Sequence, residues 1–160
     1  MKEDTSKNQL NEPMMAYVRQ PNLFATVLGR AVGQFNLMGS HELLTMSRQG
    51  LPKHGLMALA KKISLTIQEF SNIMHISERT LQRYGDDAII KTEYAEKAVE
   101  LARLYTRGEE VFGSLEKFKT WMKTPLYVFN GETPVSLLDT SVGFDIIFKE
   151  LGRIEHGIFA

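Results

Sequence analysis

The sequence contains no cysteine among its 160 residues. Disulfides, thiolate metal sites and thiol nucleophiles are therefore excluded, and the composition fits the reducing cytoplasm. No apolar run approaches the roughly 20 residues that a membrane-spanning helix needs. The polar stretch at residues 1–8 also lacks the apolar centre of a secretory signal. We therefore expect a cytoplasmic protein with no membrane partner.

The sequence also lacks an excess of charge, since 19 basic residues balance 19 acidic ones. The two halves nevertheless differ. Residues 1–84 hold ten Lys and Arg against six Asp and Glu, a net charge of +4, and residues 85–160 hold nine against thirteen, a net charge of −4. A basic half suits a polyanionic partner and an acidic half repels one. Chance segregation of surface charge would explain the difference equally well.

The usual patterns of catalytic and metal-binding residues are missing. No histidine has a partner at i+3 or i+4 that would build a metal site on one helix face. The histidines are His41, His54, His75 and His156. There is no glycine-rich phosphate loop and no nucleophile elbow. Glu155 and His156 could form an acid–base pair, but a terminal tail offers no buried pocket to tune their pKa values. We expect a protein that is not an enzyme and has no catalytic residue, cofactor or metal.

Apolar residues recur at helical spacing along the chain and nowhere alternate as they would in a substantial sheet. The predicted helices begin near Pro21, Ser40, Pro52, Thr66, Ser77, Thr92, Ser114, Thr133–Pro134 and Ser141, with stops at Gly50 and near Gly157. Gly85-Asp-Asp interrupts the periodicity and predicts a loop or domain junction. Thr92 is expected to cap a long helix, and Asp139 to cap the last one. The predicted fold class is all-α.

Residues 66–84 have the pattern of a helix-turn-helix. Thr66 and Glu69 stand at capping-box spacing, so that side chain and backbone can satisfy each other at the start of the first helix. The small side chain of Ser71 allows a second helix to approach, and Ser77 can cap that helix. His75 occupies the turn, where glycine is common because φ is positive. In this arrangement the second helix lies in the major groove of DNA.

The exposed face of the second helix carries the predicted DNA contacts. Arg79 can form a bidentate pair with guanine and Gln82 with adenine, each worth about 1–3 kcal/mol of base discrimination. Arg83, further along, is expected at a phosphate. The full predicted DNA-binding set is Ser77, Glu78, Arg79, Thr80, Gln82 and Arg83. The alternative is an ordinary amphipathic helix pair whose polar face is only solvated.

Five short motifs occur in order along residues 43–160. They are Ser77-Glu-Arg-Thr-Leu-Gln-Arg83, Val111-Phe-Gly113, the single Trp121, Thr133-Pro-x-x-Leu-Leu-Asp-Thr140 and Arg153-Ile-Glu-His-Gly157. This set resembles the antitoxin family called Xre/MbcA/ParS, with its N-terminal helix-turn-helix domain and its C-terminal toxin-binding domain. Thr92-Glu93 departs from the family's usual Ser-Glu. Trp121 is expected to pack in the core, as a lone tryptophan at helical spacing usually does.

The resemblance implies a type II antitoxin that neutralises a RES-domain, NAD-degrading toxin and represses its own operon by binding operator DNA. In this family the C-terminal segment is inserted into the toxin's active-site cleft. The plug would here consist of Arg153, Glu155, His156, Ile158, Phe159 and Ala160. A terminal carboxylate, an arginine fork and apolar anchors on one segment could imitate an anionic substrate. Arg153 and Glu155 would otherwise be ordinary surface charges.

We therefore expect a flexible N-terminal segment at residues 1–20, a helix-turn-helix DNA-binding domain at 21–88 and a helical toxin-binding domain with its plug at 89–160. A homodimer is expected, because half-sites about 34 Å apart match a two-fold axis, and so is a hetero-oligomer with the toxin. Two alternatives stay open. One is a free-standing transcription regulator whose C-terminal bundle dimerises or binds a ligand. The other is a polar-localisation adaptor with no DNA role.

Overall fold

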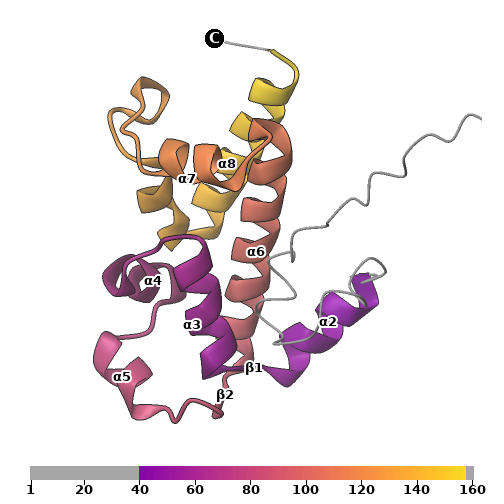
Figure 1. Cartoon of the computed structure of the whole chain (residues 1–160), viewed down its shortest axis with the longest axis vertical. Coiled ribbons are helices and arrows are strands. Elements are labelled where there is room, and N and C mark those ends of the chain that lie inside the picture. Colours follow the sequence, from indigo (N-terminus) through magenta and orange to yellow (C-terminus); the bar gives the residue numbers. More distant parts are fainter. Residues whose placement is uncertain (1–39, 158–160) are drawn as a thin grey trace, which may run out of the picture.

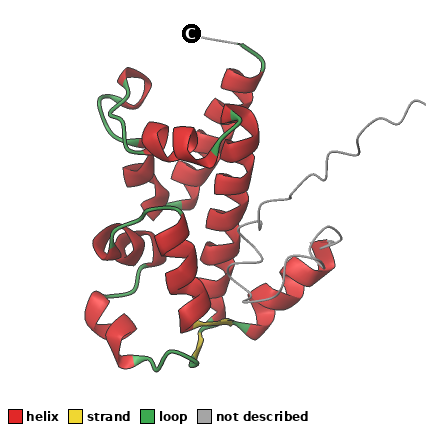
Figure 2. Ribbon diagram, in the orientation of Figure 1, coloured by secondary structure: helices red, strands yellow, loops and turns green. Residues whose placement is uncertain are grey.

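The computed structural model describes residues 40–157 (Figure 1). The predicted segment 1–20, the helix expected from Pro21 and plug residues 158–160 lie outside this range. The elements are α2 (Ser40–Gln49), β1 (Leu51–Pro52), α3 (Lys53–Lys62), α4 (Ile67–Met74), α5 (Glu78–Arg83), β2 (Ile89–Ile90), α6 (Thr92–Phe112), α7 (Leu115–Met122), η2 (Tyr127–Phe129), η3 (Pro134–Asp139) and α8 (Ser141–Glu155). Helices dominate the ribbon in Figure 2, so the predicted all-α class is confirmed.

Helix α6 is the long element on which the others pack. Figure 1 shows α3 beside its beginning and α7 and α8 beside its end, and α2 and α4 contact it as well. A Cβ on Gly108 would lie 2.3 Å from the ring of Phe118, so glycine is what allows α7 to approach α6. The buried apolar residues form one cluster that includes members of α3, α4, α6, α7 and α8. The two halves of the described chain therefore share a core.

A two-stranded sheet, with two residues in each strand, joins the start of α3 to the start of α6. Strand β1 pairs antiparallel with β2, with Leu51 opposite Ile90. Gly50 ends α2 with a φ of 80°, as its predicted stop requires. The predicted loop after α5 is tied to α3, because the amide of His54 donates to the carbonyl of Asp86. This loop is therefore held against the domain that precedes it.

Two predicted helix caps are wrong by one residue. Thr92 is the first residue of α6, and Lys91 takes the cap position without a side-chain hydrogen bond. Asp139 does not cap α8, because it is the last residue of η3. Thr140 adopts the extended conformation that a cap needs, and its hydroxyl accepts from the amide of Gly143 at 3.0 Å. Sequence patterns locate helix ends only to within a residue or two.

Candidate functional site

The first helix of the helix-turn-helix begins as predicted. The amide of Thr66 donates to the Glu69 carboxylate at 2.7 Å, and the amide of Glu69 donates to the Thr66 hydroxyl at 3.1 Å. These two bonds complete the capping box and fix where α4 starts. Phe70 and Met74 are buried on the inner face of α4, and Ser71 is also buried. The amphipathic spacing thus turns α4 toward the core.

The turn after α4 is built around His75. Its φ of 54° and ψ of 36° place it in the left-handed region, as its position in the motif predicts. The ring Nε2 lies 2.7 Å from the carbonyl oxygen of Asp139 on η3, so the imidazole donates a hydrogen bond there. Ile76, the next residue, is buried. The turn is therefore anchored both by an apolar side chain and by a bond to the C-terminal half.

Helix α5 presents all six predicted DNA-binding side chains to solvent. Ser77 caps it, since its hydroxyl accepts from the amide of Thr80 at 3.0 Å. Leu81 is the buried residue of α5 and holds it against the core. The exposed residues are Ser77, Glu78, Arg79, Thr80, Gln82 and Arg83. Neither Arg79 nor Arg83 forms an ion pair with another residue in the described part of the chain. Both guanidinium groups are free to meet an anionic ligand.

Lys123, the residue that follows α7, holds the start of α4 in place. The ammonium group of Lys123 donates to the carbonyl of Ser64 at 2.6 Å and to the carboxylate of Glu69 at 3.2 Å. Burial works to raise the pKa of Glu69, but its hydrogen bonds from Thr66 and Lys123 outweigh burial and lower it. With the His75 bond, these contacts tie the helix-turn-helix to the C-terminal half. Sequence analysis missed them, because they join residues more than fifty positions apart.

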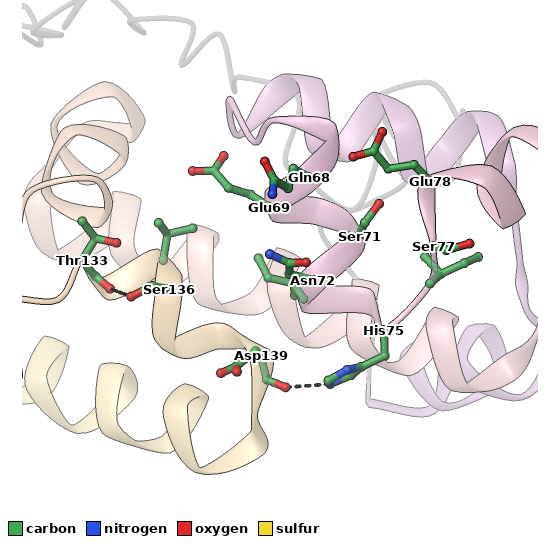
Figure 3. A pocket seen from close by; sticks show the side chains of 13 residues that line it. Gln68, Glu69, Ser71, Asn72, His75, Ser77, Glu78, Thr133, Ser136 and Asp139 are labelled. Carbon is green, nitrogen blue, oxygen red and sulfur yellow. Dashed lines mark hydrogen bonds between the residues drawn. The ribbon is translucent and has the colours of Figure 1, made fainter.

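A polar cleft of about 730 Å³ separates the helix-turn-helix from η3. One wall comes from α4 and α5 and includes Glu69, Asn72 and Glu78, and the other comes from Thr133 and Ser136. Figure 3 shows the bond between His75 and Asp139 at one edge of this cleft. No sequence pattern predicts this cleft, since its two walls lie far apart along the chain.

The predicted plug begins inside α8. Arg153 lies in the last turn of α8 and pairs with Glu150 at 3.6 Å. Glu155 is the last helical residue, and its carboxylate binds Arg107 of α6. His156 is exposed. The chain then leaves the helix at Gly157, and Figure 1 shows this end projecting from the fold. Plug residues Ile158, Phe159 and Ala160 lie outside the described residues.

A second groove, of about 360 Å³, lies between α8 and the loop that follows α7. Its apolar lining includes Val128, Phe129, Leu137 and Ile146, and Arg153 stands at its rim. Sequence analysis did not single it out.

Trp121, predicted in the core, lies half-buried in a cluster of aromatic rings, stacked on Phe118 at 5.7 Å between ring centres. The groove thus lies outside a packed core.

Within residues 40–157 no helix is long and apolar enough to cross a bilayer. The same residues contain no group of three His, Asp or Glu side chains that could hold a metal ion. The described surface carries an exposed helix with two arginines at one place and an apolar groove at another.

Two protein-family profiles match the chain. The antitoxin Xre-like helix-turn-helix domain matches residues 42–103. The antitoxin Xre/MbcA/ParS C-terminal toxin-binding domain matches residues 107–157. Together they cover more than two thirds of the chain. The matches meet within α6, and the predicted domain boundary after residue 88 lies in the loop before it.

Similar proteins carry related names. Antitoxin Xre of Yersinia enterocolitica is 27% identical over 149 residues, which are 92% of this chain and all of that protein. The Prs ADP-ribosylating antitoxin of a Sphingobium species is 22% identical and spans 82% of this chain and 92% of its own length. Antitoxin Xre of Pseudomonas putida is 28% identical over 122 residues, or 76% of each chain.

Proposed function

This chain belongs to the Xre/MbcA/ParS antitoxin family, and from that membership we propose that it neutralises a RES-domain, NAD-degrading toxin and represses its own operon. The observation that carries the proposal is the separation of two exposed surfaces. The polar face of α5 is free to enter a DNA groove, and the end of α8 projects from the other half of the fold. One chain can then hold both partners at once.

The DNA-binding half of the proposal assigns a role to each exposed side chain of α5. Arg79 pairs with guanine and Gln82 with adenine, while Ser77, Glu78 and Thr80 lie at the helix start, which faces base edges or phosphates. Arg83 contacts a phosphate. A homodimer would place two such helices in successive major grooves, and binding to operator DNA places the protein in the cytoplasm.

Fluorescence anisotropy with DNA from upstream of the gene tests this half. Arg79→Ala should weaken binding by about 10- to 100-fold, because one bidentate base contact is lost. Arg103→Ala is the matched control, since Arg103 is an exposed arginine of α6 away from the recognition helix. Equal affinity of the two variants would contradict the assignment of α5.

The toxin-binding half assigns inhibition to the terminal segment. Arg153, Glu155 and His156 lead into Ile158–Phe159–Ala160, whose apolar side chains would fill the toxin's active-site cleft. The support is that α8 carries this segment outward to Gly157. This role is one of steric exclusion and involves no catalysis by the chain.

Co-expression with the neighbouring toxin gene tests inhibition. The intact chain should restore growth and keep NAD levels constant, and a chain ending at residue 152 should do neither. The truncated chain should still bind operator DNA, because it keeps Leu81, which anchors α5, and also Lys123 and Asp139, which hold α4 and the turn. Full protection by the truncated chain would contradict the plug.

The polar cleft beside His75 favours one other candidate function, a transcription regulator controlled by a small polar ligand. In that case the protein would bind its operator without any partner, and a small molecule would alter that binding. A footprint unchanged by the toxin would support this alternative.

A further inference from the structure

Four large apolar side chains of the described C-terminal half are exposed, and two of them line the second groove. Tyr127 is 99% exposed and Val128 51% at the tip of the loop after α7, and Val142 and Ile146 are exposed on α8. Val128 and Ile146 line the same groove, and Val142 lies one turn before Ile146 on the same face of α8. Single exposed apolar residues are ordinary, but a group around a concavity marks an interaction site.

The loop that carries Tyr127 is held in a fixed shape. The amide of Gly131 donates to the carbonyl of Leu126 at 2.9 Å, and the amide of Leu126 donates to the carbonyl of Glu132 at 3.1 Å. Phe129 is buried beneath the loop and anchors it to the core. An aromatic side chain on a preorganised loop loses little conformational entropy when it binds, which is the usual property of an interface hot spot.

The rim of the groove carries balanced charge. Lys149 and Arg153 stand there with Glu132 and Glu150. A neutral rim around an apolar floor does not suit DNA, whose phosphates require an excess of positive charge. It suits a protein surface that inserts an apolar side chain and surrounds it with charges of both signs.

We propose that this groove, formed by α8 and residues 128–132, is a docking surface for the toxin that extends beyond the terminal plug and shares Arg153 with it. Ile146, Glu150 and Arg153 follow one another along one face of α8, so the groove runs into the segment proposed as the plug. All of its residues lie within the match to the toxin-binding domain. The groove supplies affinity and the plug supplies inhibition. This inference rests on the proposed function.

The test uses the full chain and the purified product of the neighbouring toxin gene. Tyr127→Ala and Ile146→Ala should each raise the Kd for the toxin by about 10-fold or more, as loss of an interface anchor does. Ile67→Ala is the matched control, because Ile67 on α4 is 40% exposed, the same fraction as Ile146. Its Kd should stay within a factor of two of the unaltered chain.

The readouts separate the two proposals. The fully exposed Tyr127 side chain contributes nothing to the core, so Tyr127→Ala should fold and melt like the unaltered chain. If the unaltered chain binds and inhibits the toxin while both variants bind as tightly as Ile67→Ala, the groove inference is overturned and the proposed function stands. If the unaltered chain does not bind the toxin, both are overturned. If the variants change only self-association in solution, the groove joins copies of this chain and the inference is again overturned.

Discussion

Helices α5 and α8 present their exposed side chains in opposite ways. Helix α5 has six residues, is held to the core by Leu81, and shows a polar and basic face. Helix α8 has fifteen residues, buries Phe144, Ile147 and Leu151, and exposes the apolar side chains of Val142 and Ile146 on the side of a groove. A short helix with a basic face suits a negatively charged ligand, because opposite charges attract one another over a distance. A long, firmly packed helix suits a partner that must be held by shape.

The difference also concerns how each helix is supported. Helix α5 depends on the turn before it, and that turn is bonded to the C-terminal half through His75 and Asp139. Helix α8 packs directly on α6 and η3. The recognition helix is therefore positioned in part by contacts from the other half, so the two surfaces share one scaffold.

The largest effect is expected where α8 begins. A Cβ on Gly143 would lie 1.6 Å from the carbonyl oxygen of Leu137, so Gly143→Ala must displace backbone. We expect a loss of about 3 kcal/mol of unfolding free energy, as for overpacked cores. Gly152→Ala on the same helix meets no atom within 4 Å and should stabilise the chain by about 0.5–1 kcal/mol. Urea denaturation measures both, and similar midpoints for the two variants would contradict the packing at η3.

Salt dependence should separate the two surfaces next. Raising the salt from 50 to 200 mM should weaken operator binding by about 100-fold, because displaced counterions drive phosphate contacts. Toxin binding should change by less than about threefold, since the charges at the rim of the groove balance. Binding titrations at four salt concentrations give the slope of log Kd against the logarithm of the salt concentration for each ligand. Equal slopes would mean that electrostatic attraction contributes equally to operator binding and to toxin binding.

The local features of this comparison could be predicted from the sequence. The Thr66 capping box, the Ser77 cap and the left-handed His75 each depend on residues within four positions of one another. The pattern of short polar side chains before apolar runs therefore located them. The exposed face of α5 followed from helical periodicity, because Leu81 had to point inward.

The features that join distant segments could not be predicted. The groove brings residues 128–132 against 146–153, and the Lys123–Ser64 bond joins positions 59 apart. No periodicity of a single helix specifies which loop lies beside it. The predicted caps at Thr92 and Asp139 were wrong for a related reason, because neighbouring elements decide where each helix begins. Strand β2 ends directly before the observed cap Lys91, and η3 ends directly before the observed cap Thr140. Sequence patterns defined the elements, and tertiary packing defined the grooves.

A smaller effect is expected in the turn that positions α5. His75→Gly and His75→Ala both remove the imidazole and its bond to Asp139, but only alanine retains a Cβ in the left-handed conformation. We therefore expect His75→Ala to be less stable than His75→Gly by about 1 kcal/mol. Denaturant unfolding of the two variants gives this difference directly. Equal stabilities would show that the turn relaxes when the histidine is removed.

The smallest effects are expected from two partly exposed glutamates. Burial works to raise the pKa of Glu69, but hydrogen bonds from Thr66 and Lys123 lower it overall. Burial raises the pKa of Glu100, and the charge of Asp145 adds to this rise. A carboxylate whose pKa is lowered by folding stabilises the protein at any pH above its unfolded-state pKa. This stability is lost as the pH falls through its folded-state pKa. A raised pKa contributes stability that is present at low pH and lost as the pH rises.

At pH 7, Glu69→Gln should therefore lower the Tm and Glu100→Gln should raise it. Solvent screens both side chains, so each change should be on the order of 1–2 °C. Glutamine can still complete the capping box at position 69, which leaves the charge as the difference tested. As the pH falls through the folded-state pKa of each carboxylate, the corresponding difference should shrink. Thermal melts across this range check the signs, and a common sign at pH 7 would mean that the two carboxylates do not lie in opposed environments.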